Sequence, residues 1–425
     1  MARRGVCSTA ARGRREMTAP AEPAALTARP SACGPLAGVR VLDLSRVLAG
    51  PWATQTLADL GAEVIKIERP GVGDDTRLWG PPFTTRADGT PGDAAYFLCA
   101  NRGKKSVELD IASPEGAAAV RDLAKTCDVV VENFKTGGLK KYGLDHASLA
   151  AINPRLVYCS ITGFGQDGPD AHRAGYDYMI QAMGGLMSIT GQPDGAAGAE
   201  PMKVGVAVVD LFTGLYASNA IMAALLHARA TGEGQAIDIA LFDVQAAMLA
   251  NQAANFFVSG KAPMRMGNAH PNLAPYQPFP CTDGMVVIAV GNDGQFRALC
   301  GALGIATMGT EARFASNAAR IEHRAALTAE LSALTAGHSM KALMGMLEAA
   351  GVPCGPVNTV DQVFDEPQAV HRGLVVEQAR DDLTGPVRTV ASPIRMSRTP
   401  VAYDLPPPAL GADTEDVLGV LKPAQ

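Results

Sequence analysis

Two aspartates in turn-forming sequence are the side chains of this chain with the best prospects for chemistry. Asp177 ends the segment Arg173-Ala-Gly-Tyr-Asp177, and Asp210 lies between two apolar runs, the second of which extends from Leu215 to Leu226. A carboxylate in apolar surroundings loses its hydration, so it is rarely buried without a partner. Without a neighbouring histidine such a group is a poor hydrolase base, but it is a nucleophile able to form an acyl-enzyme intermediate.

Asp210 also fits a simpler structural role. An aspartate at a helix N-cap accepts a backbone N–H of the first turn, and negative charge suits that end of the helix dipole. From this segment alone the N-cap is the stronger interpretation, and only the motifs elsewhere in the chain favour the nucleophile. Burial would raise the pKa of Asp210, whereas a helix N-terminus would lower it.

Metal and dinucleotide sites are not indicated. The eight cysteines and seven histidines are scattered, with no CxxC, HxxxH or HExxH spacing, so we expect no metal site. The first strand-to-helix turn, Ser45-Arg-Val-Leu-Ala-Gly-Pro51, has no GxGxxG pattern, and the chain has no Walker loop. We therefore expect no tightly bound cofactor.

Composition restricts the class of partner and the compartment. The 425 residues carry a net charge of −5, which gives no reason to expect nucleic acid. No uninterrupted apolar run reaches the roughly 18–20 residues that span a bilayer, so we expect no membrane partner. Scattered single cysteines suit the cytoplasm. The weaker alternative is mitochondrial, because residues 1–35, an extension that we expect to be disordered, contain five arginines before the first acid, Glu16.

The elements that position the two acids follow a regular alternation. Short apolar segments alternate with helical ones, which predicts parallel strands with right-handed crossovers. We expect strands at 39–45, 63–68, 106–111, 129–133, 156–162 and 236–241, with helices at 50–60 and 113–126. Residues 36–241 are thus predicted to form a large Rossmann-like, doubly wound α/β domain, in which ligands bind beyond the carboxyl ends of the strands.

The second half of the chain has a different pattern. We expect residues 242–267 to form a linker helix, at 242–257, and a loop. A strand at 285–290 and helical segments at 294–303 and 311–351 predict a small α+β domain over 268–370. The remaining residues, 371–425, are expected to return to the large domain.

Several motifs occur in order along the chain. They are Val41-Leu-Asp-Leu-Ser-Arg-Val-Leu-Ala-Gly-Pro51, Gly73-Asp-Asp-Thr-Arg77, Asn101-Arg-Gly-Lys-Lys-Ser106, Val131-Glu-Asn-Phe134, Gly163-Phe-Gly-Gln-Asp-Gly-Pro169, Arg173-Ala-Gly-Tyr-Asp177 and Gly351-Val-Pro-Cys-Gly-Pro356. Together they resemble the family III CoA-transferases over about residues 36–420. Gly80-Pro-Pro-Phe83 and the segment that begins at Gly267 look most like the succinate–hydroxymethylglutarate branch of that family.

This resemblance implies a ping-pong mechanism with Asp210 as the nucleophile. The carboxylate would attack an acyl-CoA, with succinyl-CoA as the expected donor. The reaction would then pass through an aspartyl anhydride and an aspartyl-CoA thioester to a carboxylic acceptor, which we expect to be a dicarboxylic acid. Backbone N–H groups, expected from the glycine-rich loops Gly184-Gly185 and Gly191-Gln-Pro-Asp-Gly195, would stabilise the oxyanions. The acceptor acid stays open.

The resemblance also carries over contacts to the coenzyme A part of the substrate. They fall on Leu48, Ala49, Arg69, Asn133, Phe134, Lys141 and Tyr176. Leu48 departs from the oxalate enzymes, which have Gln there, so oxalate is a doubtful acceptor. Arg102, Lys104 and Lys105 form a basic turn that suits CoA phosphates, and a solvated loop is an equally good interpretation of it.

Two other activities are weighed against CoA transfer. A racemase of the same family needs a histidine where this chain has Tyr176, whose phenol is a poor base at neutral pH. His172 lies nearby in a polar loop that we expect at the surface. A CoA-thioester hydrolase would have to admit water to the anhydride. The family resemblance further implies a homodimer of two ring-shaped chains that interlock.

Overall fold

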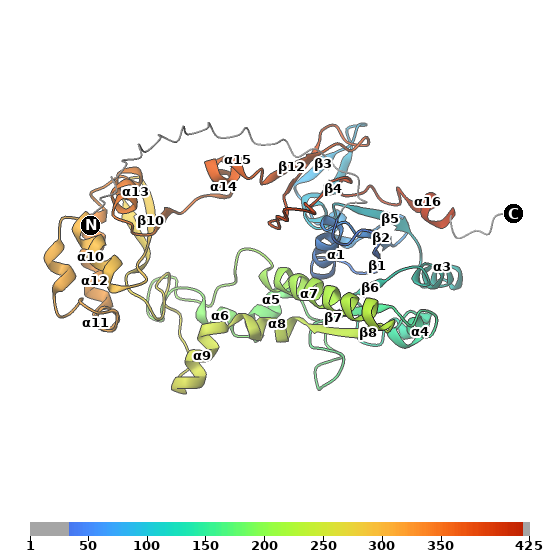
Figure 1. Ribbon diagram of the computed structural model, residues 1–425, viewed down its shortest axis with the longest axis horizontal. Helices are drawn as coiled ribbons and strands as arrows, with labels where there is room; N and C mark the ends of the chain where they lie inside the picture. The colour runs from blue at the N-terminus through green and yellow to red at the C-terminus, as the bar shows by residue number, and fades with distance from the viewer. Residues whose placement is uncertain (1–33, 420–425) are drawn as a thin grey trace, which may run out of the picture.

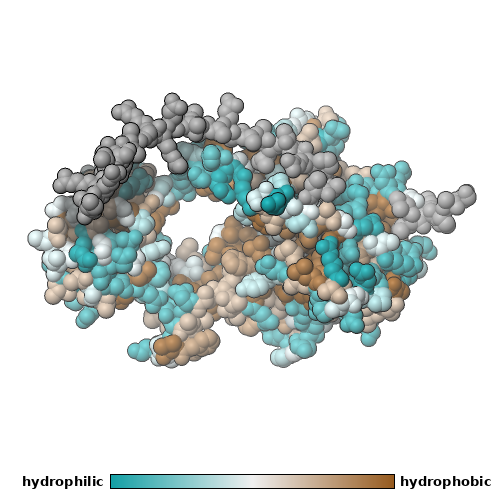
Figure 2. Space-filling model, viewed as in Figure 1, coloured by the Kyte–Doolittle hydropathy of each residue, from teal (hydrophilic) through white to brown (hydrophobic). Residues whose placement is uncertain are grey.

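The computed structural model describes residues 34–419. Nearly all of the N-terminal extension expected at 1–35, and the last six residues, lie outside this range. Figure 1 shows two lobes at opposite ends of the molecule, joined by chain segments above and below. In the space-filling view, open space is visible between the lobes (Figure 2).

The larger lobe contains a six-stranded parallel sheet in the order β5-β2-β1-β6-β7-β8. Its strands are β1 (Arg40–Asp43), β2 (Glu63–Glu68), β5 (Lys104–Glu108), β6 (Val129–Glu132), β7 (Val157–Thr162) and β8 (Gln235–Ala240). This arrangement confirms the α/β prediction and is consistent with a Rossmann-like fold. The strand order reverses between β1 and β6, and such a switch point opens a crevice at the carboxyl ends of the strands.

Helices cover both faces of this sheet because successive strand residues point to opposite sides. Val41 belongs to the core shared with α1 (Ala49–Asp59) and α7 (Val208–Thr231), whereas Leu42 belongs to the opposite core with α3 (Pro114–Ala124) and α4 (His146–Ala150). Helix α16 (Thr414–Gly419) adds Val417 to the second core, so the end of the described chain packs on the large lobe.

The smaller lobe has its own core. Its antiparallel sheet has the order β11-β10-β9, formed by β9 (Tyr276–Cys281), β10 (Gly284–Ala289) and β11 (Cys354–Pro356). The helices around it are α10 (Asp293–Ala302), α11 (Asn317–Glu322), α12 (Arg324–Thr335) and α13 (Met340–Ala349), with a short 3₁₀ helix, η4 (Ala306–Thr310). Phe279, Phe296 and Phe314 are fully buried among them.

Short elements complete the large lobe and the connections. They are η2 (Asp75–Leu78), β3 (Phe83–Thr85), β4 (Pro91–Ala94), α2 (Ala95–Leu98), η3 (Lys140–Tyr142), α5 (Asp177–Met183), α6 (Leu186–Ile189), α14 (Val360–Asp365), α15 (Pro367–His371), β12 (Val375–Gln378) and β13 (Val387–Val390). The single helix expected at 242–257 is instead two, α8 (Leu241–Met248) and α9 (Ala250–Ser259). Ala250 has a φ of 41°, a left-handed conformation that interrupts an α-helix.

Helix α7 is long and apolar enough, by length and composition, to cross a membrane. One of its faces nevertheless packs against α1, β7 and β8. Its Thr213, Gly214 and Ser218, which break the apolar run in the sequence, are buried. This face contributes Val209, Ala217 and Ile221 to the core of the sheet, whereas the other face of α7 exposes apolar side chains, among them Leu226.

Candidate active site

A cleft of about 870 Å³, partly open to solvent, lies at the carboxyl ends of β1, β6 and β7. Residues from the loops after these strands and from α7 line it. Of the residues selected from the sequence, the cleft brings together Leu48, Ala49, Asn133, Phe134, Tyr176 and Asp210. Segments far apart in the chain thus meet at the switch point of the sheet.

Asp210 is the third residue of α7 and not its N-cap, which is Ala207. The N-cap prediction is therefore wrong. The capping is done in part by Asp177, whose carboxylate accepts the backbone N–H of Val209 at 3.3 Å and two contacts from the Gln181 amide at 2.7 and 3.1 Å. Within residues 34–419 the carboxylate of Asp210 has no hydrogen-bond or ion-pair partner, so it remains free for a substrate.

Burial decides the electrostatics of Asp210. Loss of hydration, and then the charge of Asp177, raise the pKa of Asp210 to about 7. Of the two opposing effects expected from the sequence, burial outweighs the helix N-terminus. Burial also raises the pKa of Tyr96 to about 12, with a contribution from the charge of Asp210. The Tyr96 phenol is therefore near enough to Asp210 for their charges to interact, although nothing in the sequence singled out Tyr96.

The N-terminus of α1 lies beside this carboxylate. A Cβ on Gly214, one helical turn beyond Asp210, would lie only 2.7 Å from the carbonyl oxygen of Ala49, so α7 approaches α1 closely where a glycine permits it. Helix α1 has no side-chain cap, and the N–H groups of Leu48 and Ala49 make no hydrogen bond within residues 34–419. Two free donors therefore belong to residues that line the cleft.

The glycine-rich loops expected to supply such donors lie elsewhere. Neither Gly184-Gly185 nor the loop Gly191–Gly195 lines the cleft. The second loop is tied instead to the segment before the small lobe, because Arg265 pairs with Asp194 and the N–H of Gly267 donates to the carbonyl of Gly191. Although these glycine-rich loops lie between Asp177 and Asp210 in the sequence, the fold does not place them in the cleft.

Arg69 belongs to a second cavity of about 580 Å³, which shares Arg46 and Phe134 with the cleft. The two cavities are thus adjacent along the carboxyl edge of the sheet. The Arg69 side chain is largely exposed, with a guanidinium nitrogen 3.8 Å from Asp75. Lys141 lies in η3 with its ammonium nitrogen 4.6 Å from the ring centroid of Tyr142, and it lines neither cavity. Its contact with CoA stays a prediction.

The basic turn does not face either cavity. Arg102 is buried and donates to both carboxylate oxygens of Asp59, at 2.8 and 2.7 Å. Lys104 is buried and contacts Asp43 at 3.1 Å. The prediction of a solvent-facing turn for CoA phosphates is therefore wrong for Arg102 and Lys104, whose charges are already neutralised.

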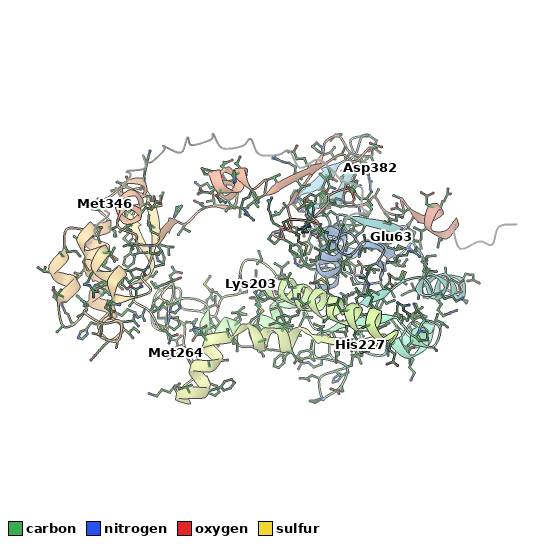
Figure 3. The ribbon with its side chains drawn as sticks, in the orientation of Figure 1. Glu63, Lys203, His227, Met264, Met346 and Asp382 are labelled. Carbon is green, nitrogen blue, oxygen red and sulfur yellow. The ribbon has the colours of Figure 1, made fainter. Side chains whose placement is uncertain are left out.

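Lys105 also lies away from the cleft. It sits near the amino end of β5 and pairs with Glu63 at 2.6 Å, at the edge of the sheet opposite Asp210. Figure 3 labels Glu63, the partner of Lys105, and Lys203, which shortly precedes the helix that carries Asp210. The two lie in separate parts of the molecule, and Lys203 faces the space between the lobes. This position does not support a contact between Lys105 and CoA phosphates.

The cleft is also lined by three cationic residues that were not among the predicted site residues: Arg46, Lys135 and Arg173. Arg46 lies 5.3 Å from the Phe134 ring and pairs with Asp75 at 3.2 Å. Arg173 pairs with Asp170 at 3.2 Å. Arg46 and Arg173 are members of the motifs quoted above, and that membership was the available signal. His172 is exposed and does not line the cleft.

No group of three or more histidine, cysteine, aspartate or glutamate side chains suited to a metal ion occurs among residues 34–419. The chemistry that the cleft itself displays is that of one partner-free carboxylate, two free backbone donors and three cationic side chains. This combination suits acyl transfer between acids, in which a carboxylate attacks and oxyanions form.

Comparisons with known proteins agree with this chemistry. The model of CoA-transferase family III matches residues 36–414. The chain is 52% identical to the succinate–glutarate CoA-transferase of Agrobacterium fabrum over 397 residues, which are 93% of this chain and 98% of that protein. It is 44% identical to the succinyl-CoA:glutarate CoA-transferase of Mus musculus, covering 90% of this chain and 86% of that protein. A solved CaiB/BaiF family protein from Brucella suis matches with a TM-score of 0.82 and 51% identity, covering 92% of this chain and 100% of that one.

Proposed function

Because the chain belongs to CoA-transferase family III, we propose that it moves CoA from one carboxylic acid to another with Asp210 as the nucleophile. The observation that carries this proposal is the position of Asp210. It is a half-buried carboxylate with no partner among the described residues, in a cleft that is also lined by Leu48 and Ala49, whose N–H groups make no hydrogen bond within residues 34–419. A carboxylate in this state is ready to attack an acyl carbon.

The proposed reaction has four steps that balance without a metal or a redox partner. The Asp210 carboxylate attacks the donor thioester, and the C–S bond breaks to give a mixed anhydride and CoA thiolate. The thiolate attacks the aspartyl carbonyl, which releases the donor acid and leaves an aspartyl-CoA thioester. The acceptor carboxylate then attacks this thioester to form a second anhydride, and the thiolate takes the acceptor acyl group and restores Asp210.

The free N–H groups of Leu48 and Ala49 are the proposed donors to the oxyanion that forms at each attack. Donors of this kind lower the barrier because they are already oriented toward the developing charge. This assignment replaces the glycine-rich loops considered from the sequence, which lie outside the cleft. The anhydride and thioester conserve the energy of the original thioester, so the whole exchange is close to reversible.

Succinyl-CoA is the proposed donor, and glutarate or a related dicarboxylate, such as hydroxymethylglutarate or itaconate, is the proposed acceptor. The names of the two relatives above support this choice. The cations in the cleft support it too. Lys135 has no ion-pair partner within residues 34–419, and the pairs of Arg46 and Arg173 are exposed to solvent, so a second carboxylate can compete for them.

CoA itself is proposed to lie along the carboxyl edge of the sheet. Its thioester would reach Asp210 and Tyr176, its pantetheine arm would pass Leu48, Ala49, Asn133 and Phe134, and its nucleotide end would lie near Arg69. The two adjoining cavities support this path, because Arg46 and Phe134 belong to both. No tightly bound cofactor is part of the proposal.

A homodimer of interlocked ring-shaped chains remains a proposal, as do the predicted domain boundaries. Two observations support the dimer. The lobes are joined on two sides with open space between them (Figures 1 and 2), and the face of α7 away from the sheet exposes Phe212, Leu215, Tyr216 and Leu226. An exposed apolar surface of this kind is typical of protein interfaces. The six cysteines of the described chain are free thiols, which suits the proposed cytoplasmic location.

The test is a screen of acid acceptors with succinyl-CoA, followed as formation of the new acyl-CoA. We expect transfer to a dicarboxylate, and a loss of at least about 10⁴-fold in Asp210→Asn. Asp243→Asn is the matched control, because Asp243 is likewise the third residue of a helix, α8, and is exposed. Full transferase activity in Asp210→Asn would contradict the nucleophile, and release of CoA without transfer would indicate a hydrolase.

A further inference from the structure

The loop between β1 and α1 contains a strained residue. Val47 has a φ of 71°, one of two positive values at non-glycine residues within 34–419. For a β-branched side chain this left-handed conformation is an outlier, and it persists only where the surroundings hold it. Leu48 and Ala49, the proposed oxyanion donors, follow directly. The conformation of Val47 therefore sets the direction in which their N–H groups point.

Buried polar groups hold the residues that precede Val47. The N–H of Ser45 donates to the Asp43 carboxylate at 2.9 Å, and its carbonyl accepts from the ammonium of Lys66 at 2.8 Å. Asn133 clamps the Arg46 backbone on both sides, since its Oδ1 accepts the N–H at 2.9 Å and its Nδ2 donates to the carbonyl at 2.7 Å. Groups on β1, on β2 and directly after β6 thus restrain two consecutive residues, Ser45 and Arg46.

Val47 itself is held by Asp74. The N–H of Val47 lies 3.3 Å from each carboxylate oxygen of Asp74. Asp74 pairs with Lys66 at 2.9 Å, and both side chains are fully buried. The hydroxyl and N–H of Thr76 also donate to Asp74, at 2.8 and 3.0 Å. Lys66 therefore connects the carbonyl of Ser45 with the carboxylate that holds Val47.

We propose that Asp74 and Lys66 are positioning residues for CoA transfer. Their buried pair keeps Val47 in its left-handed conformation, and so keeps the N–H groups of Leu48 and Ala49 directed into the cleft. Neither side chain lines the cleft, so both act through the loop. This inference rests on the function proposed above for the cleft.

A purely structural ion pair would behave differently. Loss of such a pair lowers the stability of the whole lobe but does not depend on which residue occupies position 47. A glycine at 47 adopts positive φ without strain. If Asp74 acts by holding strained backbone, its contribution to turnover shrinks once Val47 is replaced by glycine.

The test is a double-mutant cycle of Asp74→Asn and Val47→Gly, measured as kcat and KM for succinyl-CoA. With Val47 present, we expect Asp74→Asn to lower kcat on the order of 100-fold and to change KM by less than about 3-fold. In the Val47→Gly background, the same change is expected to cost about 10-fold or less. Equal losses in the two backgrounds, or an unchanged kcat in Asp74→Asn, would overturn the proposal.

Asp59→Asn is the control for loss of a buried ion pair. Asp59 lies at the opposite end of α1 and pairs with buried Arg102 at 2.7 Å. We expect a lower Tm with kcat retained in the folded enzyme. If Asp59→Asn lowered kcat as much as Asp74→Asn does, the effect of Asp74 would be one of general stability and the proposal would fail.

A crystal structure of Asp74→Asn gives a readout that needs no activity. We expect Val47 to turn to negative φ, with the N-terminus of α1 reoriented. An unchanged loop would overturn the positioning role, whatever the reaction. Failure of the wild-type enzyme to transfer CoA to any acid would instead contradict the proposed function, so the two failures are distinguishable.

Discussion

The two edges of the six-stranded sheet use charge in opposite ways. At the carboxyl edge, within the described chain, Asp210 has no partner and the N–H groups of Leu48 and Ala49 donate to nothing. At the amino edge, Lys105 and Arg40 both pair with Glu63. Basic residues in one segment of the sequence can therefore be engaged in ion pairs, while an acid elsewhere in the chain has no partner.

This difference has a physical origin. Burying a charge is unfavourable unless a partner compensates it, so most buried charges pair with one another. The exception at the carboxyl edge is maintained by the packing of α7 against α1 and by the loop that Asp74 and Lys66 hold. An unpaired group at such a site is available to a substrate.

The largest expected effect on stability is at the Arg102–Asp59 pair. Arg102→Met leaves Asp59 buried without its partner and is expected to lower the free energy of unfolding by about 3–5 kcal/mol. Denaturant unfolding measures this loss. Because Arg102 does not reach the cleft, KM for succinyl-CoA should be unchanged in the folded fraction. A large rise in KM would restore the CoA contact first assigned to Arg102.

The next effect tests how closely α7 must approach α1. In Gly214→Ala the added Cβ would meet the Ala49 carbonyl at 2.7 Å, so one helix has to move. We expect kcat to fall on the order of 100-fold, because a displacement near 1 Å would misplace Asp210, the proposed nucleophile. Steady-state kinetics measure it. Gly345→Ala in α13, where a Cβ meets nothing within 4 Å, is the matched control.

Asp177 is expected to set the pH dependence. In the proposed mechanism the free enzyme attacks through the ionised form of Asp210. Because the pKa of Asp210 is raised to about 7, we expect kcat/KM to fall as the pH drops below that value. Asp177→Asn removes a neighbouring negative charge, so the midpoint should move to lower pH, by up to about one unit. A pH profile of kcat/KM measures it, with exposed Asp167→Asn as control. A midpoint that moved upward would contradict this assignment.

The smallest effect is predicted for Lys105→Met. Its pair with Glu63 is partly exposed, and such pairs contribute about 1 kcal/mol or less. Thermal unfolding should show a small decrease in Tm, and KM for succinyl-CoA should not change. A several-fold rise in KM would return Lys105 to the CoA site and weaken the contrast between the two edges.

Much of the fold was predictable from the sequence because it depends on local pattern. Runs such as Val129-Val-Val131 are apolar on both faces, as strands buried between helices must be, and the structure contains β6 within the residues expected for that strand. The break between α8 and α9 was not predictable, because one residue, Ala250, adopts an unusual φ that no local pattern demands.

The candidate site was predictable in part. Motif membership drew attention to six residues that the structure brings to one cleft: Leu48, Ala49, Asn133, Phe134, Tyr176 and Asp210. The prediction that Arg102 and Lys104 bind CoA phosphates was based on residue type alone and was wrong. The sequence does not reveal whether a buried acid already pairs with a basic side chain. The capping of α7 was misassigned to Asp210. The N–H of Val209, in the first turn of α7, instead donates to Asp177, which begins α5.

By itself the sequence determined the family, the alternation of strands and helices, and the identity of the candidate nucleophile. Those depend on residue order and short-range periodicity. Only the tertiary structure decided which charges are free, which amides lack acceptors, and which of Asp177 and Asp210 caps the helix. These properties depend on what side chains from distant segments bury and pair, and no local pattern contains that information.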